Sequence, residues 1–245
     1  MNATSRKSPI KRLLTEIPRG RPFNTDDLRR IGISSVQASR YLNAGWLERL
    51  ARGVYQFTGD TLNRDPSLAY LAEKLPGFHV GGKTALAWRG ILHNMPAREV
   101  LTLWGAPKTK LPVWFSERFS SSYTAKNLFE SSKMPKLAPL PESPVGPPVS
   151  SLERGLIEML SEVGLNQEIG EARSVMEGAR SLRSKVIANT LQACRQEKAA
   201  RLCVGWSEEL DLPWAAAARK AVGDRFSKNR WVTRLKDGST LILKP

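Results

Sequence analysis

The stretch ISSVQASRYLNAGWLERLARGVYQF, residues 33–57, decides the fold of the N-terminal part of the chain. Its first half has the pattern of a short helix, because Ser34 and Gln37 can form a capping box and Gly45 suits the left-handed residue that ends a helix. Its second half consists of two β-prone runs on either side of residues 51–53. This half predicts a β-hairpin with a basic tip.

Two more short helices are predicted upstream of this stretch. In SPIKRLLTEIP, Ser8 can cap a helix whose first residue is Pro9, and apolar residues recur at helical spacing. In PFNTDDLRRIG, Asn24 can cap a helix that Gly32 ends. Three helices followed by a hairpin is the order of a winged helix-turn-helix, whose third helix enters the major groove of DNA. Residues 1–59 are therefore predicted to be a DNA-binding domain.

Helical phase predicts which residues of the third helix read bases. Ala38, Tyr41 and Leu42 cluster on one face, which is expected to pack on the first two helices. The opposite face and its flanks hold the candidate base-reading residues, which are Val36, Gln37, Ser39, Arg40 and Asn43. Gln and Asn can pair with adenine, Arg can pair with guanine, and Val can contact a thymine methyl group. The alternative is a solvated face on a small helical domain.

The charge distribution supports a polyanionic partner. The 245 residues have a net charge of +15, with 11 Lys and Arg against 4 Asp and Glu in residues 1–59, and 8 against 2 in residues 219–245. The candidate phosphate-binding residues are Lys7, Lys11, Arg12, Arg49, Arg52, Arg230 and Arg234. The last two are expected to extend a basic track from a C-terminal strand beside the winged helix. Their alternative role is to keep an edge strand soluble.

Residues 77–84, GFHVGGKT, match the G-x-x-x-x-G-K-T pattern of phosphate-binding loops. Such a loop needs a buried strand before it, whereas the preceding DPSLAYLAEKLPG has helical spacing. We therefore interpret Gly81 and Gly82 as a turn that permits close packing before a helix. A DNA-dependent NTPase that uses Gly77–Thr84 is the alternative.

The composition favours a binding protein over an enzyme. Two cysteines and two histidines are too few for a disulfide framework or a typical zinc site, and no residues form a plausible catalytic set. We expect no cofactor and no metal. The basic N-terminus is not followed by an apolar segment, and no stretch approaches the length of a membrane span. These features predict a cytoplasmic protein without a membrane partner.

Residues 60–245 are predicted to form a mixed α/β domain, so the fold class is α/β. Residues 100–129 contain three β-prone runs, VLTLWG, PVWFSERF and SYTAKNLF, and the runs WVTRL and TLILK near the C-terminus predict a hairpin. Helices are predicted at about 151–163, 168–178, 183–193 and 195–209. The proline-rich residues 131–150 form either a linker or a loop within the domain, and we favour the loop.

The segments VGGKTALAWRGI, VLTLWG and LPVWF together resemble the core of the AbiEi family, the antitoxins of type IV toxin–antitoxin systems. SSLERGLIEMLSEV is similar to the middle helix of the family, although Gly155 stands where alanine is usual. LERLARGVY resembles its N-terminal domain, and QACRQEKAARLCVGWSEELDLPW resembles a later segment. VGDRFSKNRW is a looser match.

The resemblance implies a bacterial DNA-binding repressor that binds inverted repeats in its own operon. It also implies an antitoxin that counters a nucleotidyltransferase-like toxin without a stable complex. The alternative is a stand-alone winged-helix regulator that has no antitoxin activity.

Overall fold

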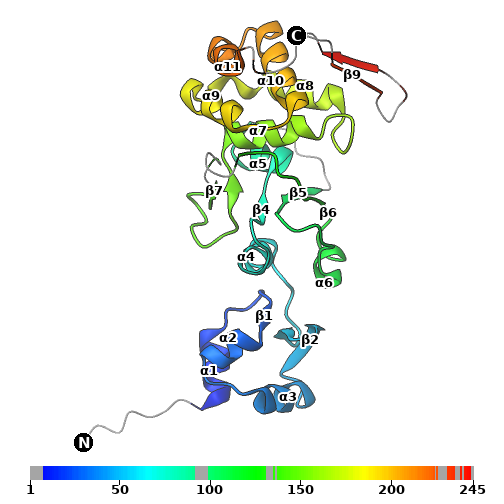
Figure 1. Cartoon of the computed structure of the whole chain (residues 1–245). Coiled ribbons are helices and arrows are strands. Elements are labelled where there is room, and N and C mark those ends of the chain that lie inside the picture. The colour runs from blue at the N-terminus through cyan, green and yellow to red at the C-terminus, as the bar shows by residue number, and fades with distance from the viewer. Residues whose placement is uncertain are drawn as a thin grey trace, which may run out of the picture.

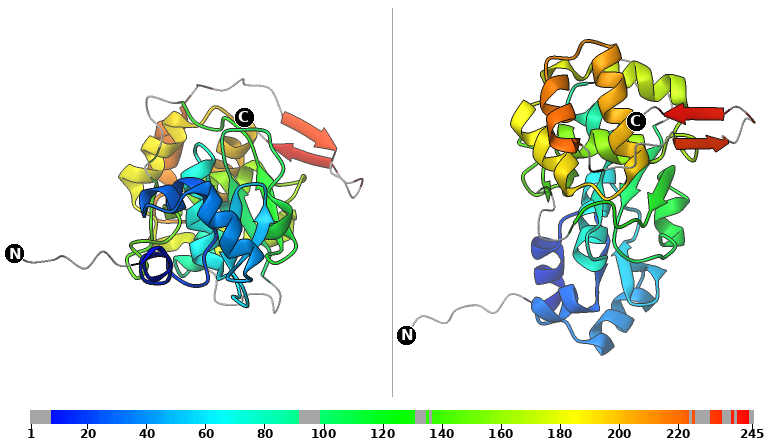
Figure 2. Two further views of the ribbon diagram at one scale, coloured as in Figure 1. Left: turned by 90° about the horizontal axis from the view of Figure 1, so that it is seen from below. Right: turned by 45° about the horizontal axis from the view of Figure 1, so that its top comes forward.

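The computed structural model describes residues 8–91, 99–130, 135, 137–223, 225, 231–234, 238 and 240–243. The chain is elongated and built in three tiers (Figure 1). The N-terminal elements form one end, a mixed sheet lies in the middle, and a cluster of helices forms the other end. Figure 2 shows the same succession from a second direction.

The N-terminal tier has the topology of a winged helix-turn-helix. Its elements are α1 (Pro9–Glu16), β1 (Phe23–Asn24), α2 (Thr25–Arg30), α3 (Ser35–Asn43), β2 (Leu47–Ala51) and β3 (Val54–Phe57). The strands form an antiparallel sheet in the order β1-β3-β2. The predicted three helices and hairpin are thus confirmed, while β1 was not predicted because two residues carry no detectable periodicity.

Side-chain caps fix where these helices begin. Asn24 and Asp27 form a capping box on α2, and Ser34 and Gln37 form one on α3. Gly45 has a φ of 73°, the left-handed conformation expected after the third helix. Below the caps, the Phe23 ring packs 5.4 Å from the ring of Phe57 in a core that contains residues from all three helices.

The middle tier is a five-stranded mixed sheet with three helices. Its elements are α4 (Arg64–Lys74), β4 (His79–Val80), α5 (Gly82–Trp88), β5 (Leu101–Trp104), α6 (Val113–Ser116), β6 (Ser121–Thr124), β7 (Leu137–Ala138) and β8 (Val149–Ser150). The strand order is β6-β5-β4-β8-β7, with parallel pairs β5–β6 and β4–β8. The proline-rich residues 131–150 contribute β7 and β8 to this sheet.

The prediction of a strand at PVWFSERF is wrong, because Val113–Ser116 is a short helix. Trp114 and Phe115 are both buried, and two adjacent side chains of a strand would point to opposite faces of the sheet. One helical turn after Pro112 lets both rings reach the same core, where Trp114 packs edge-on against Tyr70 of α4.

The C-terminal tier is helical. Its elements are α7 (Leu152–Ser161), α8 (Ile169–Glu177), a 3₁₀ turn (Ala179–Ser181), α9 (Ser184–Ala193), α10 (Glu197–Glu209) and α11 (Ala215–Val222). The four predicted helices are confirmed, and α11 is an additional helix that the sequence reading did not include. Within the described residues, no helix has the length and apolar character needed to cross a membrane.

The predicted C-terminal hairpin is present as β9 (Trp231–Arg234) and β10 (Thr240–Leu243), which pair antiparallel. Its position corrects one expectation. Figures 1 and 2 place this hairpin at the helical end of the chain, whereas α3 lies at the opposite end. Within one chain, the hairpin therefore does not lie beside the winged helix, and the two cannot form one short continuous basic surface.

Candidate DNA-binding surface

The orientation of α3 agrees with its predicted helical phase. Ala38 is buried, and Tyr41 and Leu42 pack partly buried against the N-terminal core. The candidate base-reading residues Val36, Ser39, Arg40 and Asn43 are exposed, and Val36 reaches 61 % exposure. The helix therefore presents a mixed polar and apolar face to solvent, as a recognition helix requires.

Gln37 differs from the other four candidate residues. Its Oε1 accepts a hydrogen bond from the Ser34 amide at 2.9 Å, and the Ser34 hydroxyl accepts one from the Gln37 amide at 3.2 Å. A bidentate pair with adenine needs both the oxygen and the nitrogen of the carboxamide. In this conformation only its Nε2 can donate to a base, so Gln37 must leave the capping box to read adenine.

Pairing with carboxylates separates the cations of the N-terminal tier into two groups. Arg29 and Arg30 form ion pairs with Asp26 and Asp27, which lie in the same helix. By contrast, the exposed side chains without a carboxylate partner among the described residues are Lys11, Arg40, Arg49 and Arg52. Because no carboxylate of the described residues neutralises their charge, these four are the best placed to bind phosphates.

The remaining candidate phosphate-binding residues are either engaged within the fold or not fully described by the structure. Arg12 is partly buried, and its Nη2 donates to the Gly32 carbonyl at 3.4 Å, so it also holds the turn between α2 and α3. Lys7 and Arg230 lie outside the described residues. Only the backbone of Arg234 is described, in β9. Phosphate binding by these residues stays a prediction.

The wing is short and docked against the rest of the chain. Its turn contacts the start of α2, where the Thr25 amide donates to the Gly53 carbonyl at 3.3 Å. Leu50, Ala51 and Val54 pack partly buried against the core of the middle tier. The wing therefore has a fixed position relative to both α3 and the sheet.

Trp46 is an exposed residue that the sequence reading did not select. It lies between the end of α3 and the start of β2, and it is 50 % exposed. In sequence, its position next to the buried Leu47 is that of an ordinary strand residue. The helical phase of α3 does not extend to it, because α3 ends at Asn43 and Gly45 is left-handed, so the sequence carries no signal for its exposure.

The motif Gly77–Thr84 does not have the geometry of a phosphate-binding loop. A two-residue strand, β4, lies inside the motif, and α5 begins at Gly82. The Gly82 amide donates to Oε2 of the buried Glu158 at 3.0 Å, and Lys83 pairs with Glu171 at 2.7 Å. An internal carboxylate thus occupies the end of the helix that would otherwise attract an anion.

Glu158 is fully buried and hydrogen-bonded on both oxygens. Arg154 Nε lies 2.6 Å from Oε1, His79 Nε2 lies 2.9 Å from the same oxygen, and the Ser150 hydroxyl donates to Oε2 at 2.8 Å. Burial alone would raise the pKa of Glu158, but the charges and hydrogen bonds of His79 and Arg154 lower it to about 2. This cluster joins β4, α5, β8 and α7, and solvent does not reach it.

Two of the three glycines of the motif, Gly81 and Gly82, are required by the local structure. A Cβ on Gly81 would lie 2.4 Å from Glu158 Oε2 and 2.6 Å from Trp104 Cδ1. Gly82 has a φ of 49°, which side-chain-bearing residues rarely adopt. The interpretation of Gly81 and Gly82 as a turn for close approach is confirmed.

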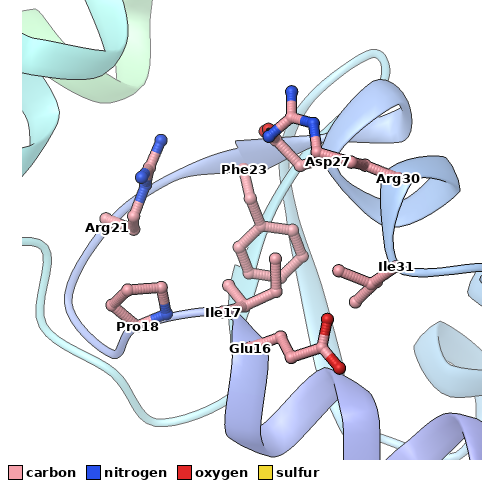
Figure 3. A pocket seen from close by; sticks show the side chains of 8 residues that line it. All are labelled: Glu16, Ile17, Pro18, Arg21, Phe23, Asp27, Arg30 and Ile31. Carbon is pink, nitrogen blue, oxygen red and sulfur yellow. The ribbon is translucent and has the colours of Figure 1, made fainter.

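A hollow of about 270 Å³ lies at the edge of the N-terminal tier, between α1 and α2. Figure 3 shows the Phe23 ring and Ile17 in its centre, with Arg21 and Arg30 on one rim and Glu16 on another. Arg30 is already paired with Asp27 at 3.3 Å. The mixed and partly neutralised charges do not single out a ligand. Across the described ranges, no group of three or more His, Cys, Asp and Glu side chains could hold a metal ion.

Comparisons with known proteins agree with this architecture. Residues 6–97 match the model of the AbiEi antitoxin N-terminal domain, a transcriptional regulator, and residues 98–242 match the model described as transcriptional regulator, AbiEi antitoxin, type IV toxin–antitoxin system. The RV2827C protein from Mycobacterium tuberculosis, known from a crystal structure, is similar in fold, with 18 % identity, a TM-score of 0.56, and coverage of 85 % of this chain and 78 % of that one. Comparison with curated proteins finds no match. The chain therefore belongs to the AbiEi family of transcriptional regulators, the antitoxins of type IV toxin–antitoxin systems.

Proposed function

We propose that the protein is a sequence-specific DNA-binding repressor that acts through the exposed face of α3. The observation that carries this proposal is the exposed Arg40, which has no carboxylate partner in the described part of the chain and lies between the exposed residues Val36 and Asn43 on a capped helix. In this role, Arg40 pairs with guanine, Asn43 pairs with adenine, and Val36 contacts a thymine methyl group. Ser39 and the free Nε2 of Gln37 add further hydrogen bonds to base edges.

Lys11, Arg49 and Arg52 then bind phosphates on either side of the groove, which supplies affinity without sequence information. Arg12, Lys7, Arg230 and Arg234 remain candidates for the same role. Because the C-terminal hairpin lies at the far end of the chain, β9, which contains Arg234, reaches DNA only if the duplex or a second copy of the chain extends to it.

The family supports a further, finer proposal. The protein represses its own operon by binding inverted repeats, and it counters a nucleotidyltransferase-like toxin without forming a stable complex. The proposed role is binding rather than catalysis. Two copies on such repeats would place their α3 helices in successive major grooves, about 34 to 36 Å apart.

The test uses the full-length protein and DNA from upstream of its own reading frame. The upstream duplex that the parent protein binds most tightly is the selected duplex. Arg40→Ala should weaken binding to it by about 1 to 3 kcal/mol and relax the sequence preference of the protein. Arg29→Ala is the matched control, because Arg29 is also exposed but paired with Asp26 at 3.0 Å, and we expect it to change affinity little. If Arg40→Ala binds as tightly and selectively as the parent protein, α3 is not the recognition helix.

The antitoxin part of the proposal is tested separately. The neighbouring reading frame is expressed alone and together with this protein, and growth is measured. Rescue of growth supports an antitoxin. If the neighbour is toxic and co-expression gives no rescue, the protein is a stand-alone regulator.

A further inference from the structure

Trp46 is unusual among the tryptophans whose side chains the structure describes. Trp104, Trp114, Trp206 and Trp214 are buried, and Trp88 is partly buried with its indole N–H bonded to Glu99 at 2.8 Å. Trp46 is half exposed, and its indole N–H has no acceptor among the described residues. Large exposed aromatic side chains with a free donor are typical of binding surfaces.

The backbone of Trp46 is held at both of its polar groups. Its amide donates to the Tyr41 carbonyl at 2.9 Å, and its carbonyl accepts from the Thr58 amide at 3.2 Å. The next residue, Leu47, is buried in the N-terminal core. The backbone that carries the exposed indole is therefore already ordered, so binding through the indole costs little backbone entropy.

The surroundings of Trp46 favour an anionic partner. It follows the exposed series of α3, with Arg40 before it and Arg49 after it, and neither arginine has a carboxylate partner among the described residues. Glu48, the nearest acid in the sequence, accepts a hydrogen bond from Gln56 and keeps its charge, but the two arginines outnumber it. A two-fold contact between two copies of this surface would bring together two patches of net positive charge, which is unfavourable. A phosphate backbone complements both arginines and the indole donor.

We propose that Trp46 is a DNA-binding residue that fixes the C-terminal end of α3 on the duplex. Its ring packs on a deoxyribose beside the major groove, and its Nε1–H donates to a phosphate oxygen. This role rests on the proposed DNA binding by α3. Because sugars and phosphates do not vary with sequence, Trp46 contributes affinity and position rather than base preference.

The first test compares the parent protein, Trp46→Phe and Trp46→Ala on the selected duplex and on an unrelated duplex. Trp46→Ala should lose about tenfold in affinity for both duplexes, since it loses a hydrogen bond to a charged group together with the ring contact. Trp46→Phe keeps a ring without the donor and should lose less. The three melting temperatures should agree, because the side chain lies outside the core, and Val113→Ala, at an exposed site on α6, should leave affinity unchanged.

The second test follows the indole itself by acrylamide quenching of tryptophan fluorescence. The parent protein should show a quencher-accessible component that Trp46→Phe lacks, and the selected duplex should protect it. If the parent protein binds DNA while Trp46→Ala keeps full affinity and the duplex gives no protection, the role of Trp46 is refuted and binding by α3 stands. If protection instead rises with protein concentration in the absence of DNA, a second copy covers Trp46 and the inference is wrong. If the parent protein binds no DNA, both proposals fail.

Discussion

Replacing Glu158 by glutamine should strongly destabilise the protein. The carboxylate is completely buried and accepts hydrogen bonds from His79, Ser150 and Arg154 and from the amide of Gly82. Glutamine removes the negative charge and leaves the buried Arg154 guanidinium without a counter-ion. Breaking a buried ion pair in this way costs about 3 to 5 kcal/mol.

The lowered pKa of Glu158 reflects the same interactions with His79 and Arg154. It falls from an ordinary 4.5 to about 2, which corresponds to about 3 kcal/mol of stability at pH 7. Because the pKa is lower in the folded state, this stabilisation is complete above the unfolded value and disappears as the pH falls through about 2. At pH 3 less than half of it should remain, because this pH lies only about one unit above the folded pKa.

Urea unfolding at pH 7 and at pH 3 measures both quantities. The difference between the parent protein and Glu158→Gln should shrink by about half on acidification. Glu209→Gln is the control, since Glu209 pairs with Arg173 at the surface and should contribute less than about 1 kcal/mol at pH 7. A loss below about 1 kcal/mol for Glu158→Gln, or a loss that does not diminish at pH 3, would refute this account of the cluster.

Three further predictions concern two glycines and the motif Gly77–Thr84. Gly81→Ala should cost about 1 to 3 kcal/mol in urea unfolding, because its methyl group would overlap Glu158 and Trp104, and a cost near zero would contradict the close approach. Gly205→Ala, in α10 with no atom within 4 Å of the added methyl group, should instead stabilise by about 0.5 to 1 kcal/mol. Mg-ATP should leave the melting temperature unchanged, whereas a ligand at 100 times its dissociation constant adds about 2.7 kcal/mol, so a shift that Lys83→Ala abolishes would restore the NTPase alternative.

The helices were predictable because local chemistry fixes them. The caps Ser8, Asn24 and Ser34, and the left-handed Gly45, act within a few residues, so the sequence alone indicates where α1, α2 and α3 begin and where α3 ends. The short strands β4, β7 and β8 were not predictable. Two residues show no periodicity, and these strands exist only because partners from distant parts of the chain lie beside them.

The sequence predicted which face of α3 is exposed. It did not predict which of two roles the side-chain atoms on that face take. Helical phase correctly predicted that Arg40 and Asn43 are exposed, because it depends only on the spacing of residues. The same pattern marked Gln37 both as part of a capping box and as a reader of adenine, and the structure has its oxygen in the capping box. The exposure of Trp46 depends on the fold of the hairpin, so it could not be read from the sequence.

Counting Lys and Arg along the sequence has a similar limit. It gave equal weight to the basic N-terminal and C-terminal segments, because it does not show which of these charges are paired in the fold. In the C-terminal segment, Arg219 pairs with Glu208 through two hydrogen bonds, and Arg225 donates to the carbonyls of Gln192 and Cys194. These cations stabilise the helical tier and are less available to a polyanion. On the N-terminal tier, Arg40 and Arg49 remain without such partners among the described residues. The capacity of a basic segment to bind DNA thus depends on which of its charges the fold leaves unpaired, and for this chain that criterion selects the surface of α3 and the wing.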